Sequence, residues 1–221
     1  MSGGPGTDGG AAAGADGDPL AAHWNRIYAG KPETELGWYE ADAGRTLAFL
    51  DRLPMGALPW VFLPGAGTSR LADALAARGM RLILDDVSDE ALSRLRARLG
   101  VAGAEAIWLH HDVSRPLPEG LPPVDLWIDR AVLHFLLDEK SIEVYFANLR
   151  RLLRPGGHVL LAEFSPSGAV RCAGLDVHRY SLDEMARRLG PEFTLLESEE
   201  SVFVNPAGAP RPYLHALFRR A

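Results

Sequence analysis

The 221-residue chain has one cysteine, Cys172, no excess of basic residues and no long apolar run. A single cysteine excludes an internal disulfide and a cysteine-based zinc cluster, and it favours an intracellular protein over a secreted one. The 23 Lys and Arg are outnumbered by 29 Asp and Glu, which argues against a nucleic-acid-binding protein because such proteins carry a basic face. No segment approaches the ~18 consecutive apolar residues of a membrane span. We therefore expect a cytoplasmic protein with no nucleic-acid partner and no membrane contact.

The first 18 residues lack large apolar side chains after Met1. Such a composition cannot bury enough apolar surface to offset the entropy lost on ordering, so this segment is predicted to be a disordered tail. It has neither the basic start nor the apolar stretch of a signal peptide. We therefore predict two parts, a tail over residues 1–18 and a single domain over residues 19–221.

Short apolar runs alternate with amphipathic stretches through the rest of the chain. The runs lack the alternation of a half-exposed strand, which predicts central parallel strands. They lie at residues 61–63, 82–84, 107–109, 126–128 and 159–162. Apolar residues three or four positions apart between them, such as Ile142, Tyr145 and Leu149, predict covering helices. Near the C-terminus, residues 193–204 and 212–219 flank a turn-rich segment and predict an antiparallel hairpin.

These elements predict an α/β, doubly wound, Rossmann-like fold. Five parallel strands and the C-terminal hairpin would form a mostly parallel seven-stranded sheet, with helices on both faces. Ligands of such folds bind beyond the carboxyl ends of the strands. The residues that follow each strand are therefore the candidates for function.

A glycine loop, Pro64-Gly-Ala-Gly-Thr-Ser69, follows the first predicted strand and precedes a helical pattern. Glycine lets the backbone approach a ligand closely, and the helix start offers unpaired N–H groups; a plain strand–helix turn would use the same glycines. The third glycine of a dinucleotide-binding motif would fall at Arg70, which disfavours a nicotinamide-dependent oxidoreductase. No Gly-Lys-Ser/Thr follows, so the loop is not a phosphate-binding P-loop.

The second strand ends in two acids, Asp85 and Asp86, about 20 residues after the glycine loop, where an acid can accept both hydroxyls of a ribose. We choose Asp86, because Ser88 then caps the next helix; a solvated acid near a helix start is the alternative. The third strand ends in His111, Asp112 and Val113. Asp112 can accept a hydrogen bond from an adenine amine, and Val113 offers its backbone and an apolar contact.

Two further pairs of polar residues lie at strand ends. His110 and His111 are adjacent, but successive strand residues face opposite sides and cannot chelate one ion, so no metal site is expected. Asp129 and Arg130 follow the fourth strand. Removing a charged pair from water directly after a buried strand costs free energy unless the charges have partners. This favours a functional role over the alternative, in which the two charges pair with each other and with a helix end.

In combination these motifs resemble class I S-adenosylmethionine-dependent methyltransferases over about residues 20–221. Gly65-Ala-Gly67 matches the family's glycine loop, Asp86 its ribose-binding acid, and Asp112-Val113 its adenine contact. Leu153-Arg-Pro-Gly-Gly157 matches the turn before its fifth strand. The resemblance implies the methyltransferase variant of the Rossmann-like fold, with S-adenosyl-L-methionine as cofactor.

Within that superfamily, Val61-Phe-Leu-Pro64 and Asp129-Arg130-Ala resemble the thiopurine methyltransferase branch and related small bacterial methyltransferases, in which an aromatic N-terminal segment covers the cofactor. The resemblance therefore implies that residues 19–40 form an aromatic lid. The implied cofactor-binding residues are Trp24, Tyr28, Leu63, Gly65, Ala66, Gly67, Asp86, Val87, Asp112, Val113 and Arg130.

The chain departs from the family at four positions. Leu63 stands where most class I enzymes carry an acid that helps to hold the cofactor's amino group, although the thiopurine branch also lacks this acid. The related bacterial group usually has other residues at the positions of Ile128, Phe203 and Arg211. These departures motivate an alternative function, a non-catalytic relative that binds the cofactor or a partner protein.

The resemblance implies transfer of a methyl group to a nucleophile by in-line displacement. The protein must align the reacting atoms and exclude water. A thiolate acceptor needs little base catalysis, whereas some amine and hydroxyl acceptors need a general base. Asp129 and His134 are the candidate catalytic bases, with His178 a third, and Arg130 is expected to orient the cofactor carboxylate or an anionic substrate.

The expected acceptor is a small molecule, with a protein side chain as the second option. The residues predicted to line the substrate side are Trp38, Cys172, His178, Arg179 and Tyr180. Simple loop packing is the alternative for Cys172, Arg179 and Tyr180, because Ser181-Leu-Asp-Glu184 has the pattern of a capping box that fixes where this loop ends.

Overall fold

A computed structural model describes residues 18–54, 56 and 58–221. The predicted tail lies outside these residues, apart from Asp18. That residue caps the first helix, because its carboxylate accepts a hydrogen bond of 2.9 Å from the backbone N–H of Leu20.

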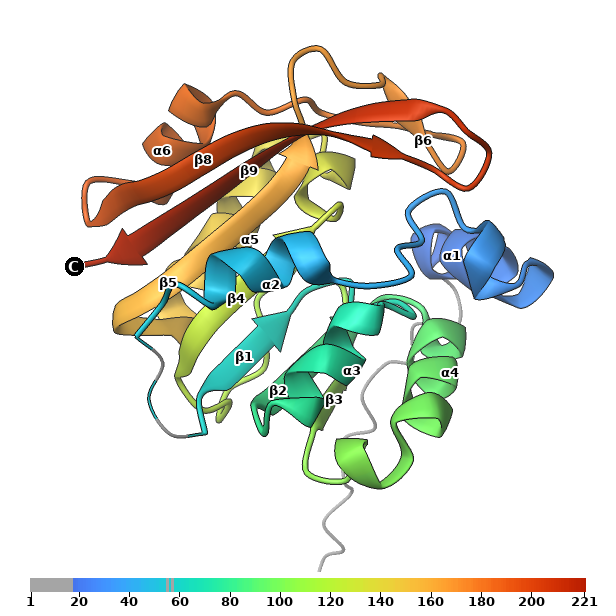
Figure 1. The fold of residues 1–221 in the computed structure, drawn as a ribbon, viewed down its shortest axis with the longest axis horizontal. Coiled ribbons are helices and arrows are strands. Elements are labelled where there is room, and N and C mark those ends of the chain that lie inside the picture. Colours follow the sequence, from blue (N-terminus) through green and yellow to red (C-terminus); the bar gives the residue numbers. More distant parts are fainter. Residues whose placement is uncertain (1–17, 55, 57) are drawn as a thin grey trace, which may run out of the picture.

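One seven-stranded sheet forms the centre of the molecule, in the order β3-β2-β1-β4-β5-β9-β8 (Figure 1). Strands β1 to β5 are parallel, and β9 runs antiparallel to both β5 and β8. The strands are β1 (Trp60–Leu63), β2 (Arg81–Asp86), β3 (Ile107–His110), β4 (Val124–Arg130), β5 (Leu153–Phe164), β8 (Phe193–Val204) and β9 (Pro210–Arg220). The predicted mostly parallel sheet with a C-terminal antiparallel hairpin is confirmed.

Helices cover both faces of this sheet. They are α1 (Pro19–Gly30), α2 (Gly44–Leu50), α3 (Arg70–Ala77), α4 (Asp89–Leu99), α5 (Glu139–Leu152) and α6 (Leu182–Leu189), with short 3₁₀ turns at Glu33–Glu35, Gly100–Gly103 and Leu133–Phe135. A second small sheet, β6 (Arg171–Cys172) and β7 (Leu175–Asp176), lies beyond β5.

Two apolar cores follow from the alternation of side chains along the strands. On one face α5 and α6 pack against alternate strand residues such as Phe62, Trp127 and Leu161. On the other face α2, α3 and α4 pack against the residues in between, such as Val61 and Ile128. Because the central strands are covered on both faces, their sequences are apolar runs rather than alternating patterns.

The predicted turn before the fifth strand lies inside β5. The strand begins at Leu153, which pairs with Val124, and the next pair joins His158 to Leu126. Four residues of β5 therefore oppose one residue of β4, and Gly156 has a φ of +77° in this irregular segment. The Pro-Gly-Gly sequence is accommodated as a local bulge, and regular pairing resumes after it.

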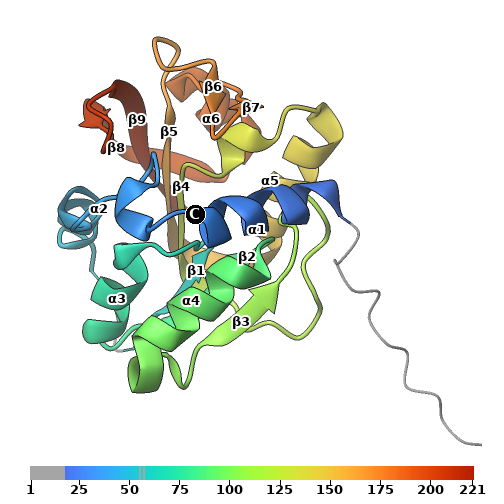
Figure 2. The same cartoon turned by 90° about the vertical axis from the view of Figure 1, so that its right-hand side faces the viewer.

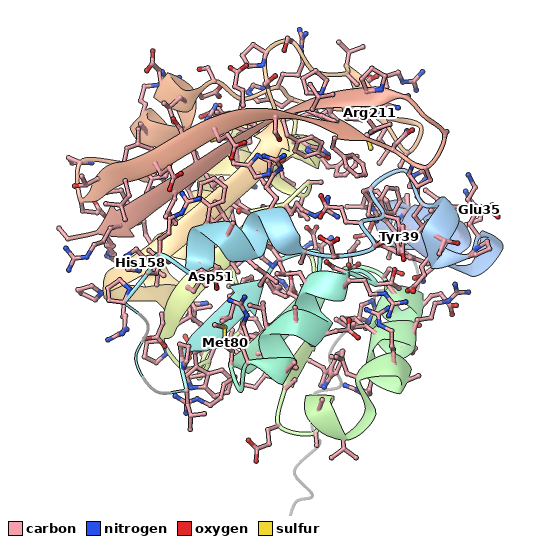
Figure 3. The ribbon with its side chains drawn as sticks, in the orientation of Figure 1. Glu35, Tyr39, Asp51, Met80, His158 and Arg211 are labelled. Carbon is pink, nitrogen blue, oxygen red and sulfur yellow. The ribbon has the colours of Figure 1, made fainter. Side chains whose placement is uncertain are left out.

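The N-terminal segment lies at the edge of the sheet where the parallel strands end. Seen end-on in Figure 2, α1 runs across this edge and beside α4. Figure 3 shows Glu35 and Tyr39 on this side of the molecule, whereas His158 and Met80 lie toward the opposite ends of the strands. The chain thus begins by covering the edge at which ligands of doubly wound folds bind.

Candidate functional site

The glycine loop after β1 has a backbone that only glycine suits. Gly65 and Gly67 have φ values of +50° and +53°. A Cβ atom on Gly65 would collide with the side chain of Val132, and one on Gly67 would collide with the hydroxyl of Tyr28. Both glycines are therefore required by conformation and by close approach of a second segment.

Asp86, the last residue of β2, holds this loop in place. Its carboxylate accepts hydrogen bonds of 2.8 Å from the backbone N–H groups of Gly67 and Ser88. Burial raises the pKa of Asp86 to about 6, although these two hydrogen bonds favour the charged form. Ser88 caps α4 through Ala91, as predicted. Each carboxylate oxygen can accept a second hydrogen bond, so Asp86 retains acceptor capacity.

Helix α1 brings aromatic side chains to the same edge. The ring of Trp24 lies 5.0 Å from that of Phe135 and 5.5 Å from that of Trp38, measured between centroids, and both pairs are edge-to-face. Tyr28, one helical turn after Trp24, is buried against Trp38. Aromatic pairs in this geometry stabilise packing beyond simple burial.

Two polar contacts tie α1 to its surroundings. The side chain of Asn25 donates to Asp89 and accepts from the hydroxyl of Ser88, both at 2.6 Å, which joins α1 to the start of α4. A ring nitrogen of His23 lies 3.1 Å from the carbonyl oxygen of Ala173, in the turn between β6 and β7. The predicted lid therefore contacts the start of α4 on one side and the turn between β6 and β7 on the other.

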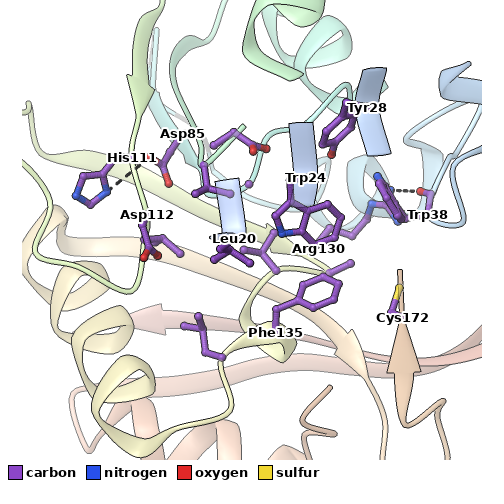
Figure 4. Close-up of a pocket in the computed structure, with 17 residues that line it drawn as sticks. Leu20, Trp24, Tyr28, Trp38, Asp85, His111, Asp112, Arg130, Phe135 and Cys172 are labelled. Atoms are coloured by element: carbon purple, nitrogen blue, oxygen red, sulfur yellow. Dashed lines mark hydrogen bonds and ion pairs between the residues drawn. The ribbon is translucent and has the colours of Figure 1, made fainter. Parts of the chain in front are cut away.

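A cavity of about 110 Å³ lies beneath α1 and opens to solvent. Figure 4 shows its two ends, with the side chains of Asp85, His111 and Asp112 at one end and those of Phe135 and Cys172 toward the other. The cavity therefore joins a polar end to an apolar, aromatic end.

A smaller hollow continues along the glycine loop and shares Tyr28, Trp38, Gly65 and Arg130 with the cavity. The guanidinium of Arg130 donates to the carbonyl oxygen of Trp38 at 2.6 Å, and its Nε lies 3.3 Å from a carboxylate oxygen of Glu40. Arg130 thereby connects β4 to the segment after α1.

The structure brings the predicted cofactor-binding residues together around these two hollows. Those that line the main cavity are Trp24, Tyr28, Gly65, Asp86, Val87, Asp112, Val113 and Arg130. Leu63, Ala66 and Gly67 line the smaller hollow. Of the predicted substrate-side residues, Trp38 and Cys172 line the main cavity.

The candidate base Asp129 is fully buried beneath the site and does not line the cavity. Its carboxylate accepts hydrogen bonds from the backbone N–H groups of Val132 and Leu133, at 3.0 and 3.1 Å, and from the hydroxyl of Tyr145 at 2.6 Å. Burial and the nearby carboxyl of Glu163 raise the pKa of Asp129 well above its usual range. The carboxyl group expected at the ligand edge instead holds the loop after β4.

His134, the second candidate base, is also fully buried and outside the cavity lining. Its Nδ1 lies 2.6 Å from a carboxyl oxygen of Glu163. Burial lowers the pKa of His134 to about 3 and raises the pKa of Glu163 to about 8. Both side chains are therefore neutral near pH 7, and neither reaches an acceptor in the cavity.

Three predicted substrate-side residues lie away from the cavity. His178 is 3.0 Å from the carboxylate of Glu184, and a guanidinium N–H of Arg179 donates to the carbonyl oxygen of Pro166 at 2.8 Å. Tyr180 is fully buried in the core against α5 and α6. Ser181 caps α6 by accepting from the N–H of Glu184, so this loop follows the packing alternative.

Sequence reasoning missed several lining residues. Asp85 and His111 line the polar end, and Phe135 and Leu136 line the aromatic end. The pair of acids at the end of β2 was a visible signal for Asp85, but only one of the two was selected. Phe135 carried no signal of its own, because an apolar residue after a strand is equally consistent with the core.

Two other site types receive no support within the described part of the chain. No group of three or more His, Cys, Asp or Glu side chains is arranged to hold a metal ion there. Among the same residues, no helix has the length and apolar character needed to cross a membrane.

Comparison with known proteins points to one family. Residues 61–157 match the model of a methyltransferase domain. Nodulation protein S of Rhizobium tropici is 33% identical over 96 residues, which are 43% of this chain and 39% of that protein. The match thus covers well under half of the curated relative.

Solved structures agree over nearly the whole chain. An S-adenosylmethionine-dependent methyltransferase from Anabaena variabilis superposes with a TM-score of 0.74 at 18% identity, covering 92% of this chain and 94% of that one. The N-methyltransferase NodS from Bradyrhizobium japonicum, solved with S-adenosylhomocysteine, superposes with a TM-score of 0.63 at 18% identity. The superposition covers 90% of this chain and 98% of that one. Residues 61–157 thus match a methyltransferase domain, and the chain has the fold of these S-adenosylmethionine-dependent methyltransferase structures.

Proposed function

We propose that the chain transfers a methyl group from S-adenosylmethionine to a nucleophile of a small molecule bound beside it. The observation that carries this proposal is the cavity under α1, which continues along the glycine loop and has an acidic and an aromatic end. The cofactor supplies an electrophilic methyl group on a sulfonium. The protein's part is to bind, to orient and to exclude water.

The residues around the cavity fit the cofactor. Asp86 offers a buried acceptor for ribose hydroxyls, next to the glycine loop that it braces. The segment Asp112-Val113 borders the polar end, where an adenine ring fits. Arg130 lies beside the glycine loop and has further N–H groups for a carboxylate. A Cβ atom on Gly67 would collide with the hydroxyl of Tyr28, so this part of the loop has no room for a larger side chain.

The aromatic end fits the reacting centre and the acceptor. Trp24, Trp38 and Phe135 surround it, and Cys172 enters from β6. Aromatic faces attract a sulfonium by a cation–π contact and exclude water from the reacting atoms. Burial raises the pKa of the Cys172 thiol, which keeps it protonated and poorly nucleophilic. We assign Cys172 to the wall of the acceptor site.

The acceptor class follows from which groups reach the aromatic end. The carboxyls that line the cavity, Asp85, Asp86 and Asp112, lie at or near its polar end, and the candidate bases Asp129 and His134 are sealed below. An acceptor that needs little base catalysis therefore suits this site, such as a thiolate or an amine with a free lone pair. We propose an uncharged or weakly charged acceptor with an apolar or aromatic body.

Calorimetric titration with S-adenosylmethionine, followed by an acceptor panel read out as release of S-adenosylhomocysteine, tests the proposal. We expect cofactor binding and turnover with members of an aromatic thiol and amine series. Absence of cofactor binding by the wild type would overturn the proposal. Binding without turnover across the panel would favour the non-catalytic alternative.

A further inference from the structure

Two acids that the proposed chemistry does not use lie beneath the cavity, at the ends of neighbouring strands. Asp129 is near the end of β4 and Glu163 near the end of β5, and both side chains are fully buried. Among the described residues, no lysine or arginine forms an ion pair with either acid. Arg130, which follows Asp129, pairs with Glu40 instead. His134 lies beside Glu163 and is neutral near pH 7. A buried carboxylate without a cation is costly, so acids in such a place keep their protons.

The two carboxyl groups also contact each other. A hydrogen bond joins the side chains of Asp129 and Glu163, and such a bond requires a proton on at least one of them. Burial raises the pKa of Glu163 to about 8 and that of Asp129 well above its usual range. The other titratable groups that face the pair are neutral near pH 7, because burial lowers the pKa of the histidine and raises the pKa of the tyrosines; they are His134, Tyr145, Tyr180 and Tyr213. The pair therefore holds at least one proton at neutral pH.

Three successive backbone N–H groups of the turn after β4 donate to this pair. Those of Val132 and Leu133 donate to Asp129 at 3.0 and 3.1 Å. The next one, of His134, donates to Glu163 at 3.3 Å. Because these hydrogen bonds are buried, loss of an acceptor would leave a donor without a partner and would weaken the hold on the turn.

The turn itself is strained and forms part of the cavity wall. Ala131 has a left-handed backbone with a φ of +68°. A residue with a side chain rarely adopts this conformation, and it persists only where surrounding contacts hold it. Ala131, Val132 and Phe135 line the cavity. Val132 also lies against the glycine loop, where a Cβ atom on Gly65 would come within 2.4 Å of its side chain. A shift of the turn would therefore change the shape of the cavity.

We infer that Glu163 is a positioning residue, which acts with Asp129 to hold the strained turn and thereby the wall that carries Val132 and Phe135. Its side chain does not line the cavity, so it acts through the turn. The neutral carboxyl fits this role, because it can donate to a neighbouring acceptor and accept from the N–H of His134. The inference rests on the proposed function, because the position of the wall is measured through binding of S-adenosylhomocysteine.

Urea unfolding at a series of pH values compares the wild type with Glu163→Gln, whose amide does not titrate. In the unfolded chain Glu163 loses its proton near the ordinary value of 4.5, whereas in the folded protein it keeps the proton up to about pH 8. The folded state binds the extra proton between these values, so wild-type stability falls there as the pH rises. We expect the unfolding equilibrium constant of the wild type to rise relative to that of the variant, by up to about tenfold per pH unit, and to level off above about pH 8. Parallel curves for the two proteins would overturn the inference.

Calorimetry with S-adenosylhomocysteine at pH 7 reads the position of the wall. Glu163→Gln keeps an acceptor for the N–H of His134 and a donor for Asp129, and it should bind like the wild type. Glu163→Leu has a similar size and no polar group. We expect this variant to bind about tenfold more weakly, because the turn loses part of its hold.

Glu184→Leu is the matched control, because Glu184 is an acid whose hydrogen bonds go to His178 and Arg188, away from the cavity. It should lose stability and keep its affinity. Equal loss of affinity in Glu163→Gln and Glu163→Leu, or no loss in either, would overturn the inference and leave the proposed function intact. If Glu163→Leu does not fold, the pH dependence of Glu163→Gln still decides. Absence of S-adenosylhomocysteine binding by the wild type would refute the proposed function itself.

Discussion

The carboxylates at the end of β2 and those at the ends of β4 and β5 look alike in sequence and differ in use. Asp86 braces the glycine loop and lines the cavity. Asp129 and Glu163 are sealed below it, where Asp129 accepts three hydrogen bonds from the protein itself. An acid whose acceptor capacity is consumed internally supports structure, and one with capacity left and access to a cavity can bind a ligand.

The sharpest test of this contrast is Asp129→Ala. It leaves the N–H groups of Val132 and Leu133 and the hydroxyl of Tyr145 without their buried acceptor. We expect the free energy of unfolding, measured in urea, to fall by about 3–5 kcal/mol. Tyr145→Phe removes one of the three hydrogen bonds and should cost about 1 kcal/mol. A loss below 1 kcal/mol in Asp129→Ala would show that the sealed acid is not structural.

Asp86→Ala should weaken cofactor binding, in addition to the stability lost when the N–H groups of Gly67 and Ser88 lose their buried acceptor. Loss of a charge-assisted acceptor for the ribose hydroxyls is worth about 1.5–3 kcal/mol, or roughly 10–150-fold in the dissociation constants of S-adenosylmethionine and S-adenosylhomocysteine. Calorimetry checks both ligands. Equal affinity in wild type and Asp86→Ala would contradict the assignment.

The same acid predicts a pH dependence of cofactor affinity. Burial raises the pKa of Asp86 to about 6, so its carboxylate is charged at pH 7.5 and becomes protonated as the pH falls through about 6. The charged form is the better acceptor, and we expect affinity to fall by up to about tenfold between about pH 7.5 and 5. Asp86→Asn should remove this contribution and flatten the curve. An undiminished slope in that variant would assign the titration to another group.

The predicted lid is tested by its response to cofactor. We expect the segment 19–40 to become protected from proteolysis when S-adenosylmethionine is added, because α1 covers the cavity. Intrinsic fluorescence should change in the wild type and much less in Trp24→Leu. Equal cleavage with and without cofactor would support static packing of Trp24 and Tyr28 instead.

The smallest expected effect is at the start of that segment. Asp18→Ala removes the N-cap of α1 and its contact with Arg115 at 3.2 Å, and should lower stability by about 1 kcal/mol or less. Removal of residues 1–17, which sequence composition predicts to be disordered, should leave the melting temperature nearly unchanged. A drop of several degrees in the truncated protein would contradict that prediction.

Residue order along the chain was sufficient to predict the fold. The apolar runs at residues 61–63 and 126–128, the glycine loop and the caps at Ser88 and Ser181 are local patterns with local causes. The spacing of apolar residues, the residues that form turns and the helix caps all depend on neighbours in sequence. They can therefore be recognised without knowledge of tertiary contacts. The resemblance based on them identified the methyltransferase domain correctly.

Tertiary structure alone decided which acids, histidines and aromatic residues reach the cavity. Asp85 and Asp129 both follow apolar runs, yet Asp85 faces an opening and Asp129 faces Tyr145 and two backbone N–H groups. That difference depends on what α5 and the loop after β4 place opposite each side chain. Burial and acceptor occupancy are properties of residues distant in sequence, so no local pattern could have separated the buried acid from the one that lines the cavity.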